Sequence, residues 1–232
     1  MTRLNTKSLA DELNKFVQTN GLSHLSVFSD LLDYIIAGFD LEHKPIKGWK
    51  YNANQTQFFA SMTMSYLNLM KEELQRAEWY DAWGDLFMEL IGHFAGYRGQ
   101  FFTPPSLTDG MAAIMNIEQL PSAVCGAFGL RIVACDPACG SSRTLLSIHA
   151  KMISEGKDKP YLIGEDLDNL CVKMSAINMC VHGCFGEVVC HNSLEEQGAV
   201  RFGYIINQGL YPFPGLPSIR YAEDPALFMC CR

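Results

Sequence analysis

Apolar residues recur three and four positions apart through the first part of the chain, which is the spacing of amphipathic helices. These series run over residues 9–17, 28–36, 55–76 and 82–95. Pro45 and Gly48 interrupt the pattern between the second and third series. The pattern therefore predicts four or five helices, which form an all-helical N-terminal subdomain over residues 1–97.

After Pro121 the pattern changes to short apolar runs that alternate with amphipathic stretches. The runs cover residues 130–135, 161–164, 187–190 and 203–206. Strands separated by helices favour right-handed crossovers and a parallel sheet, so we expect an α/β domain over residues 98–232. Three prolines in residues 212–217 indicate a loop, and residues 226–230 are a candidate for one further short strand.

The composition supports a globular protein. Of the 232 residues, 48% are apolar and only 19% are charged. Nine cysteines without an export signal are expected to be reduced thiols, and no apolar run is long enough for a membrane span, so a cytoplasmic location is expected. The net charge of -7 gives no electrostatic support for binding nucleic acid, and any contact with DNA must be local or come from a partner.

The segment Asp136 to Ser142 is the candidate ligand-binding turn. It follows the predicted strand 130–135, and ligands of open parallel sheets bind beyond the carboxyl ends of the strands. Small residues let the backbone approach a ligand, and the helix that begins near Ser142 offers free N–H groups to a carboxylate. Asp136 could accept a hydrogen bond from an ammonium group. A plain tight turn with a capping aspartate stays open as the alternative.

A second candidate lies at the end of the next predicted strand, where the sequence continues Glu165-Asp166-Leu167-Asp168. A carboxylate at this position can accept hydrogen bonds from both ribose hydroxyls of a nucleotide. The alternative is that Asp166 or Asp168 caps the following helix. The sequence contains neither G-x-G-x-x-G nor G-K-[ST], which argues against NAD and P-loop ligands.

Three ordered motifs resemble those of adenine-specific DNA methyltransferases of the gamma order, especially the modification subunits of type I restriction systems. Gly99 to Pro104 resembles the G-x-F-x-T-P motif, and Asp136 to Ser142 resembles D-P-A-C-G-S-G. Residues 164–168, with 176–179 and 182–183, resemble the ribose-binding strand and the helix after it. The resemblance covers Gly99 to Leu194. It implies the Rossmann-like sheet of an S-adenosylmethionine-dependent methyltransferase, and a protein with a role in DNA methylation and restriction-modification.

The resemblance also implies roles for individual residues. Those expected to line the methionine end of the cofactor are Gln100, Phe101, Phe102, Thr103 and Pro104, and those expected to cradle it are Ala138, Cys139 and Gly140, while Asp136 would accept from its ammonium group. Thr103 would donate a hydrogen bond, while one of the two phenylalanines packs on the cofactor and the other only in the core. Glu165, beside Asp166, would hold the ribose. Asn192 and Ser193 stand where the family has Asp-Ser/Thr, and an asparagine can still accept from the adenine amino group.

The catalytic motif departs from the family. Where the family has Asn/Asp/Ser-Pro-Pro-aromatic after its fourth strand, this chain has Asn207-Gln208-Gly209-Leu210-Tyr211, so only Asn207 matches. If the chain is active, Asn207 and Tyr211 would position the target adenine. Only about 25 residues follow Ile206, which implies an incomplete sheet whose fourth strand needs a cover. The cover could be the tail, a second copy or a separate subunit, so a homo- or hetero-oligomer is expected.

Two functions therefore stay open: methyl transfer to the exocyclic amino group of adenine in DNA, and an inactive cofactor-binding subunit or regulator that works with a partner. A small-molecule or RNA methyltransferase would not need the Gly99 to Pro104 motif, which argues against that class. Five residues form a metal-ligand-like group, but their spacing fits no common zinc site, and no metal is expected. They are Cys180, His182, Cys184, Cys190 and His191.

Overall fold

The computed structural model describes residues 6–91, 102–125, 129–195, 200–208 and 216–229. The chain divides into two compact units, the first with residues 1–38 and 43–101 and the second with residues 39–42 and 102–232. The first unit is helical and the second contains a sheet, so the predicted mixed α/β fold is confirmed. Within the described ranges, no helix has both the length and the apolar character that a membrane crossing requires.

Four helices are described in the first unit: α1 Lys7–Asn20, α2 His24–Phe39, α3 Ala53–Glu73 and α4 Ala82–Leu90. Local signals explain their bounds. Gly21 ends α1 with a φ of 62°, a left-handed conformation that glycine adopts without a steric penalty. Asn52 begins α3 through a capping box with Gln55. Phe28 packs edge-on against Trp83 in the core, so the predicted apolar series becomes the buried face.

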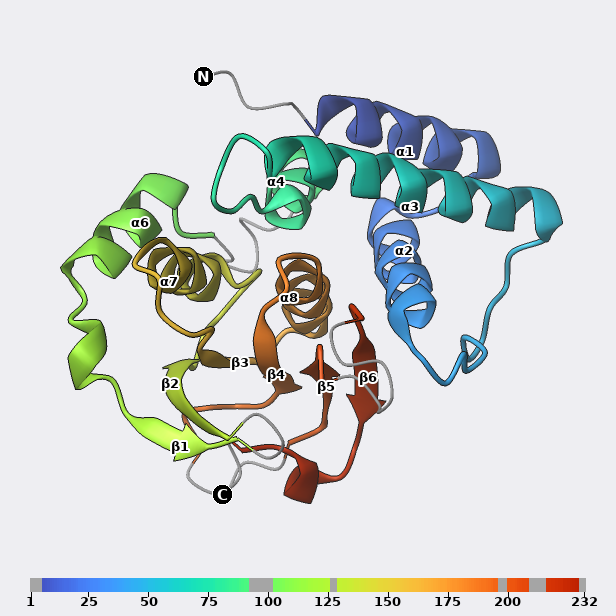
Figure 1. Ribbon diagram of the computed structural model, residues 1–232. Helices are drawn as coiled ribbons and strands as arrows, with labels where there is room; N and C mark the ends of the chain where they lie inside the picture. The colour runs from blue at the N-terminus through green and yellow to red at the C-terminus, as the bar shows by residue number, and fades with distance from the viewer. Residues whose placement is uncertain (1–5, 92–101, 126–128, 196–199, 209–215, 230–232) are drawn as a thin grey trace. The chain divides into compact units, whose positions relative to one another are not determined.

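The second unit is built on a six-stranded sheet with the order β1-β2-β3-β4-β5-β6 (Figure 1). The strands are β1 Ser122–Val124, β2 Leu130–Asp136, β3 Tyr161–Asp166, β4 Phe185–Cys190, β5 Phe202–Ile206 and β6 Ile219–Ala222. β2, β3 and β4 run parallel to one another, as the alternation of strands and helices predicts. β1, β5 and β6 each pair antiparallel with a neighbour.

The expectation of a parallel fourth strand is wrong, because β5 runs antiparallel to β4. Only residues 191–201 connect these two strands, and the described part of that connection contains no helix. A parallel crossover needs a dozen or more residues, usually with a helix, whereas an antiparallel return does not. β5 therefore ends at the edge of the sheet where β2, β3 and β4 begin.

The tail covers the edge of β5. β6 pairs along β5 from Gly203↔Ala222 to Ile206↔Ile219. The short strand expected over residues 226–230 is wrong: Pro225–Leu227 form a 3-10 turn that the side chain of Asp224 caps. Phe228 follows, fully buried against Val189, Ile205 and Ala222. Of the three elements considered as a cover for the edge of β5, the tail of the chain is the one that pairs with it among the described residues.

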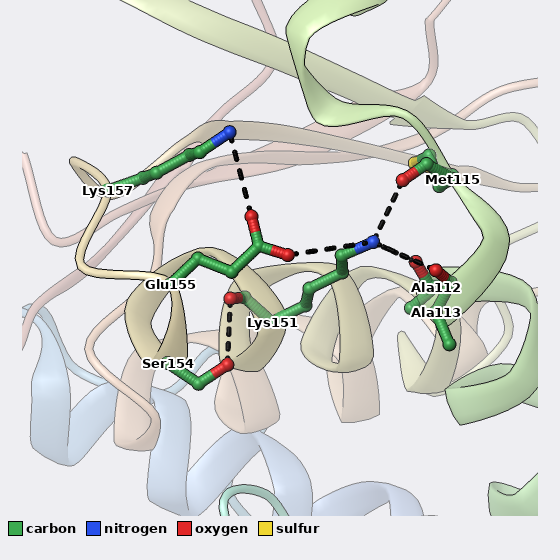
Figure 2. Close-up of polar contacts among 7 residues, drawn as sticks. All are labelled: Ala112, Ala113, Met115, Lys151, Ser154, Glu155 and Lys157. Carbon is green, nitrogen blue, oxygen red and sulfur yellow. Dashed lines mark hydrogen bonds and ion pairs between the residues drawn. The ribbon is translucent and has the colours of Figure 1, made fainter.

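Three helices accompany the sheet: α6 Pro105–Ile114, α7 Arg143–Ser154 and α8 Asn169–Val181. α7 and α8 lie on the same face of the sheet, and α6 packs beside α7 (Figure 1). Lys151 of α7 joins the two helices, because its Nζ donates to the carbonyls of Ala112, Ala113 and Met115 at 2.8, 3.1 and 2.8 Å (Figure 2). The last carbonyls of a helix have no i+4 partner within it, so the cation adds a donor at this end of α6, where the Ala112 carbonyl also accepts from the Met115 N–H at 3.2 Å.

Candidate functional site

The glycine turn after β2 is closed by its own hydrogen bonds. Asp136 Oδ1 accepts from the Ala138 N–H at 3.1 Å, and the Ser142 N–H donates to the Cys139 carbonyl at 2.7 Å. Gly140 and Ser142 have φ values of 53° and 73°, both in the left-handed region. Ser142 stands where the resembled motif has glycine, which explains why that motif prefers glycine there. The turn brings backbone to the carboxyl edge of the sheet without bulky side chains.

Two hydrogen bonds hold this turn against the end of β3. The Cys139 N–H donates to the Glu165 carbonyl, and the Gly140 N–H donates to Asp166 Oδ2, both at 2.9 Å. Asp166 Oδ1 accepts from the Asp168 N–H at 2.8 Å. Burial raises the pKa of the Asp166 carboxyl, while the two backbone N–H groups oppose that rise. In this structure the carboxylate of Asp166 joins the turn to β3, and its expected contact with the cofactor stays a prediction.

The start of α8 settles which aspartate is the helix cap. Asp168 Oδ1 accepts from the N–H groups of Leu170 at 2.7 Å and Cys171 at 3.4 Å. Of the two aspartates considered as the cap of this helix, Asp168 is therefore the N-cap. Glu165 is the carboxylate at the tip of β3 that remains beside the turn.

α8 also supports the turn through two polar residues, of which Asn178 lies in the resembling segment 176–179 but neither was expected to have a role in the site. Asn178 Nδ2 donates to the Ser141 carbonyl at 2.9 Å, and the hydroxyls of Ser142 and Ser175 are hydrogen-bonded to each other. Both α8 side chains are fully buried. Their only signal in the sequence is polar character inside an otherwise apolar helix. They make the turn a supported structure rather than a mobile loop.

The thiol of Cys139 lies within this support and is buried. Burial raises the pKa of the Cys139 thiol well above its ordinary value. A thiol that stays protonated is a poor nucleophile, so Cys139 is a packing residue of the turn.

Phe102 lies against the glycine turn. A Cβ atom on Gly140 would be 3.0 Å from two carbons of the Phe102 ring, so the ring contacts the glycine directly. The Arg143 guanidinium lies 5.6 Å from the centre of the same ring, and its Nη1 donates to the Thr103 carbonyl at 3.2 Å. Arg143 was missed because its contacts lie 40 residues earlier in the chain. Gln100 and Phe101 lie outside the described residues, and Pro104 precedes the first residue of α6.

The side chain of Glu165 is 12% exposed and lies between two neighbours. Its Oε2 is 3.3 Å from His191 Nδ1, and its Oε1 is 3.9 Å from the Cys135 Sγ. Burial, followed by the charge of Glu165, raises the pKa of the Cys135 thiol to about 11. Glu165 thus stands at the carboxyl tip of β3, where a ribose-binding acid is expected.

The segment after β4 is also tied to the glycine turn. Ser193 Oγ donates to the Pro137 carbonyl at 2.8 Å. Among the described residues, Asn192 makes local contacts: its Oδ1 accepts from the Leu194 N–H at 3.3 Å, and its Nδ2 donates to Glu195 at 2.7 Å. The ends of β2, β3 and β4 are therefore brought together, and the expected adenine contacts of Asn192 and Ser193 stay predictions.

Asn207 lies at the opposite edge of the sheet. Ile206 pairs with Gly186 near the start of β4, whereas Cys190 at its end pairs with Asp166. At about 3.3 Å per residue these positions are roughly 13 Å apart along the strand. The antiparallel course of β5 therefore places Asn207 away from the glycine turn and Glu165, and its expected role in positioning adenine stays a prediction. Tyr211 lies outside the described residues.

The amide of Asn207 is used inside the fold. Its Nδ2 donates to the carbonyls of Cys180 at 3.1 Å and Cys184 at 2.8 Å. Its Oδ1 accepts from the Ser218 N–H at 2.9 Å, and the residue is only 6% exposed. Asn207 thus joins the end of α8 to the start of β4 and to the segment before β6.

The metal-ligand-like group is divided between the two edges. Cys180 and Cys184 lie around Asn207, while Cys190 and His191 lie at the end of β4 beside Asp166 and Glu165. Within the described ranges, no three histidine, cysteine, aspartate or glutamate side chains come together as metal ligands would.

Three parallel strands with a glycine turn after the first and an acid after the second have the layout of a nucleotide-binding α/β sheet. The family model of the N-6 DNA methylases matches residues 78–208, which is more than half of the chain. The chain belongs to this family, and it is a methyltransferase-like protein.

The chain is also similar to three solved structures. A protein assigned as a class I S-adenosylmethionine-dependent methyltransferase from Listeria monocytogenes is 14% identical with a TM-score of 0.49, covering 82% of this chain and 54% of the other. A modification subunit assigned to a type I restriction enzyme of Vibrio vulnificus is 18% identical with a TM-score of 0.35, covering 64% and 26%. A type I restriction-modification methyltransferase subunit from Streptococcus thermophilus is 20% identical with a TM-score of 0.31, covering 79% and 39%.

This chain thus spans about half or less of the length of each of these proteins. Among curated proteins, none matches the chain.

Proposed function

We propose that this chain binds S-adenosylmethionine at the carboxyl edge of β2, β3 and β4. The observation that carries the proposal is the junction of the glycine turn with the tip of β3, where Cys139 and Gly140 donate to Glu165 and Asp166 at 2.9 Å. This junction places the backbone of residues with small side chains beside a carboxylate. A nucleoside with a charged amino-acid tail needs both features in one place.

The residues fit such a ligand in two ways. Gly140 lets the Phe102 ring lie directly against the turn, since a Cβ atom there would come within 3.0 Å of two ring carbons, so an aromatic ring borders the place proposed for the ligand. Three carboxylates border this edge, those of Asp136, Glu165 and Asp166. The cofactor carries a sulfonium and an ammonium cation, which acidic surroundings favour.

The bound cofactor supplies a methyl group on a positively charged sulfur. The residues of this chain would bind and orient it. Glu165 would accept from the ribose hydroxyls, Asp136 from the ammonium group, and the first N–H groups of α7 would face the carboxylate. Phe102, held by Arg143, would pack beside the turn.

We propose further that the chain does not position adenine through Asn207, and that it works as a cofactor-binding component whose partner supplies the groups that hold the base. The saturated amide of Asn207 at the other edge of the sheet supports this role. A partner would also explain how a chain of net charge -7 acts on DNA. The second candidate is an active adenine methyltransferase, which the extent of the family match to residue 208 favours.

Calorimetric titration with S-adenosylmethionine tests the binding proposal. We expect saturable binding to the wild-type chain and a loss of at least about tenfold in affinity for Glu165→Ala, because one hydrogen-bonded carboxylate contributes roughly that factor. Glu155→Ala, a change at the exposed end of α7, is the matched control and should leave the affinity unchanged. Equal affinities for the two variants would contradict the proposed site.

Methyl transfer is tested separately with radiolabelled S-adenosylmethionine and unmethylated DNA of mixed sequence. Binding of the cofactor without labelling of the DNA is the result expected for a cofactor-binding component. Labelled adenine would favour the second candidate.

A further inference from the structure

His191 follows β4 directly and lies beside Glu165. Its backbone N–H donates to the Asp166 carbonyl at 3.0 Å, and its Nδ1 is 3.3 Å from Glu165 Oε2. The two side chains are 18% and 12% exposed, so water competes little for this contact. In the sequence, His191 stands out only as a member of the metal-ligand-like group.

A carboxylate at the tip of a strand can turn about its own side-chain bonds. A donor fixed to one oxygen restricts this rotation and leaves the other oxygen, which lies on the side of Cys135, to accept from a ligand. The backbone hydrogen bond of His191 to Asp166 fixes the main chain that carries the ring, because Asp166 ends β3 and His191 directly follows its neighbour β4. His191 therefore has the position and the chemistry to orient Glu165.

An imidazole donates through Nδ1 when that nitrogen carries a proton, and the 3.3 Å separation lets it donate to Glu165 Oε2.

We propose that His191 is a positioning residue that orients Glu165 for the ribose hydroxyls of the cofactor. The inference rests on the proposed function, because it assigns a partner to the acid of that site. It predicts that the contribution of His191 to binding requires both Glu165 and the hydroxyls of the ligand.

The test uses the full chain and two ligands, S-adenosylhomocysteine and its 2′,3′-dideoxy analogue, in calorimetric titrations. His191→Ala should weaken the binding of S-adenosylhomocysteine about tenfold but that of the dideoxy analogue less than about twofold. His191→Asn places an amide N–H near the position of Nδ1 and should restore affinity to within about threefold of wild type. In a Glu165→Gln background, the alanine change should have little further effect, because its partner is already altered.

The outcomes separate the two levels of inference. An equal loss for both ligands would mean that His191 only packs the loop, and an unchanged affinity in His191→Ala would also overturn the proposal. In either case S-adenosylhomocysteine still binds the wild type and the proposed function stands. If the wild type binds neither ligand, the proposed function fails and this inference fails with it. Thermal melting of each variant verifies that the fold is retained.

Discussion

Asn207→Asp distinguishes a structural from a catalytic role for this residue. The resembled family accepts Asn, Asp or Ser at its catalytic position, so a catalytic Asn207 should tolerate aspartate. In the structure the Nδ2 group donates to two carbonyls in a site that is 6% exposed. Aspartate loses both hydrogen bonds, each worth about 1 kcal/mol, and turns an acceptor toward the two carbonyls at a further cost of about 1–3 kcal/mol. We expect Asn207→Asp to lower the free energy of unfolding of the second unit by about 3–5 kcal/mol.

Hydrogen exchange is the suitable assay, because the three tryptophans at positions 49, 79 and 83 all belong to the first unit and do not report on the second. Exchange should accelerate in α8 and β5, where Asn207 makes its contacts. Asn169→Asp, an exposed change in the first turn of α8, should alter stability by less than about 0.5 kcal/mol. If the amides of α8 and β5 exchange as slowly in Asn207→Asp as in Asn169→Asp, the structural role of Asn207 is refuted.

Three further predictions concern the same unit. Gly140→Ala adds a Cβ atom 3.0 Å from the Phe102 ring at a φ of 53°. It should lower the free energy of unfolding in urea by about 1–2 kcal/mol and weaken the binding of the cofactor. Gly110→Ala, whose added Cβ atom would meet nothing within 4 Å, should be neutral or stabilising. Burial, helped by Lys159 and His182, lowers the pKa of His149 from 6.5 to about 4, so the unfolded chain takes up this proton first as the pH falls. Stability should therefore decline by up to about 3 kcal/mol between pH 6.5 and 4, a dependence that His149→Gln should flatten in unfolding curves at several pH values. Lys151→Met removes the donor to three carbonyls at the end of α6 and should lower the free energy of unfolding by about 1–2 kcal/mol in thermal or urea unfolding. Lys157→Met should lower it by less than about 0.5 kcal/mol, and equal effects of the two variants would contradict the role of Lys151 as an anchor.

The parts of the fold that depend on local signals could be predicted. The four apolar runs became β2 to β5 with bounds within a few residues, because buried strands need continuous apolar side chains. The glycine turn and Glu165 were also predictable, since each follows directly from the end of a strand. The caps were predictable only as alternatives, because Asp166 and Asp168 have the same chemistry and differ only in which backbone N–H groups they meet.

The direction of β5 could not be derived from its own residues. An apolar run pairs equally well in either direction, and the connection over residues 191–201 decided the outcome. The same limit applies to β6, whose four residues carry no strong pattern and gain their pairing from β5. The supports of the turn, Arg143, Ser175 and Asn178, reach partners about 30–40 residues away, which only the packed structure brings near.

In the proposed function the cofactor binds at the carboxyl edge of β2, β3 and β4, away from Asn207. Ultraviolet crosslinking of radiolabelled S-adenosylmethionine to the chain, followed by mapping of the labelled peptide, tests this location directly. We predict label in the peptides that contain residues 136–142 or 165–168, and none when an excess of unlabelled cofactor is present. Competable label confined to peptides around Asn207, or no label at all, would contradict the account.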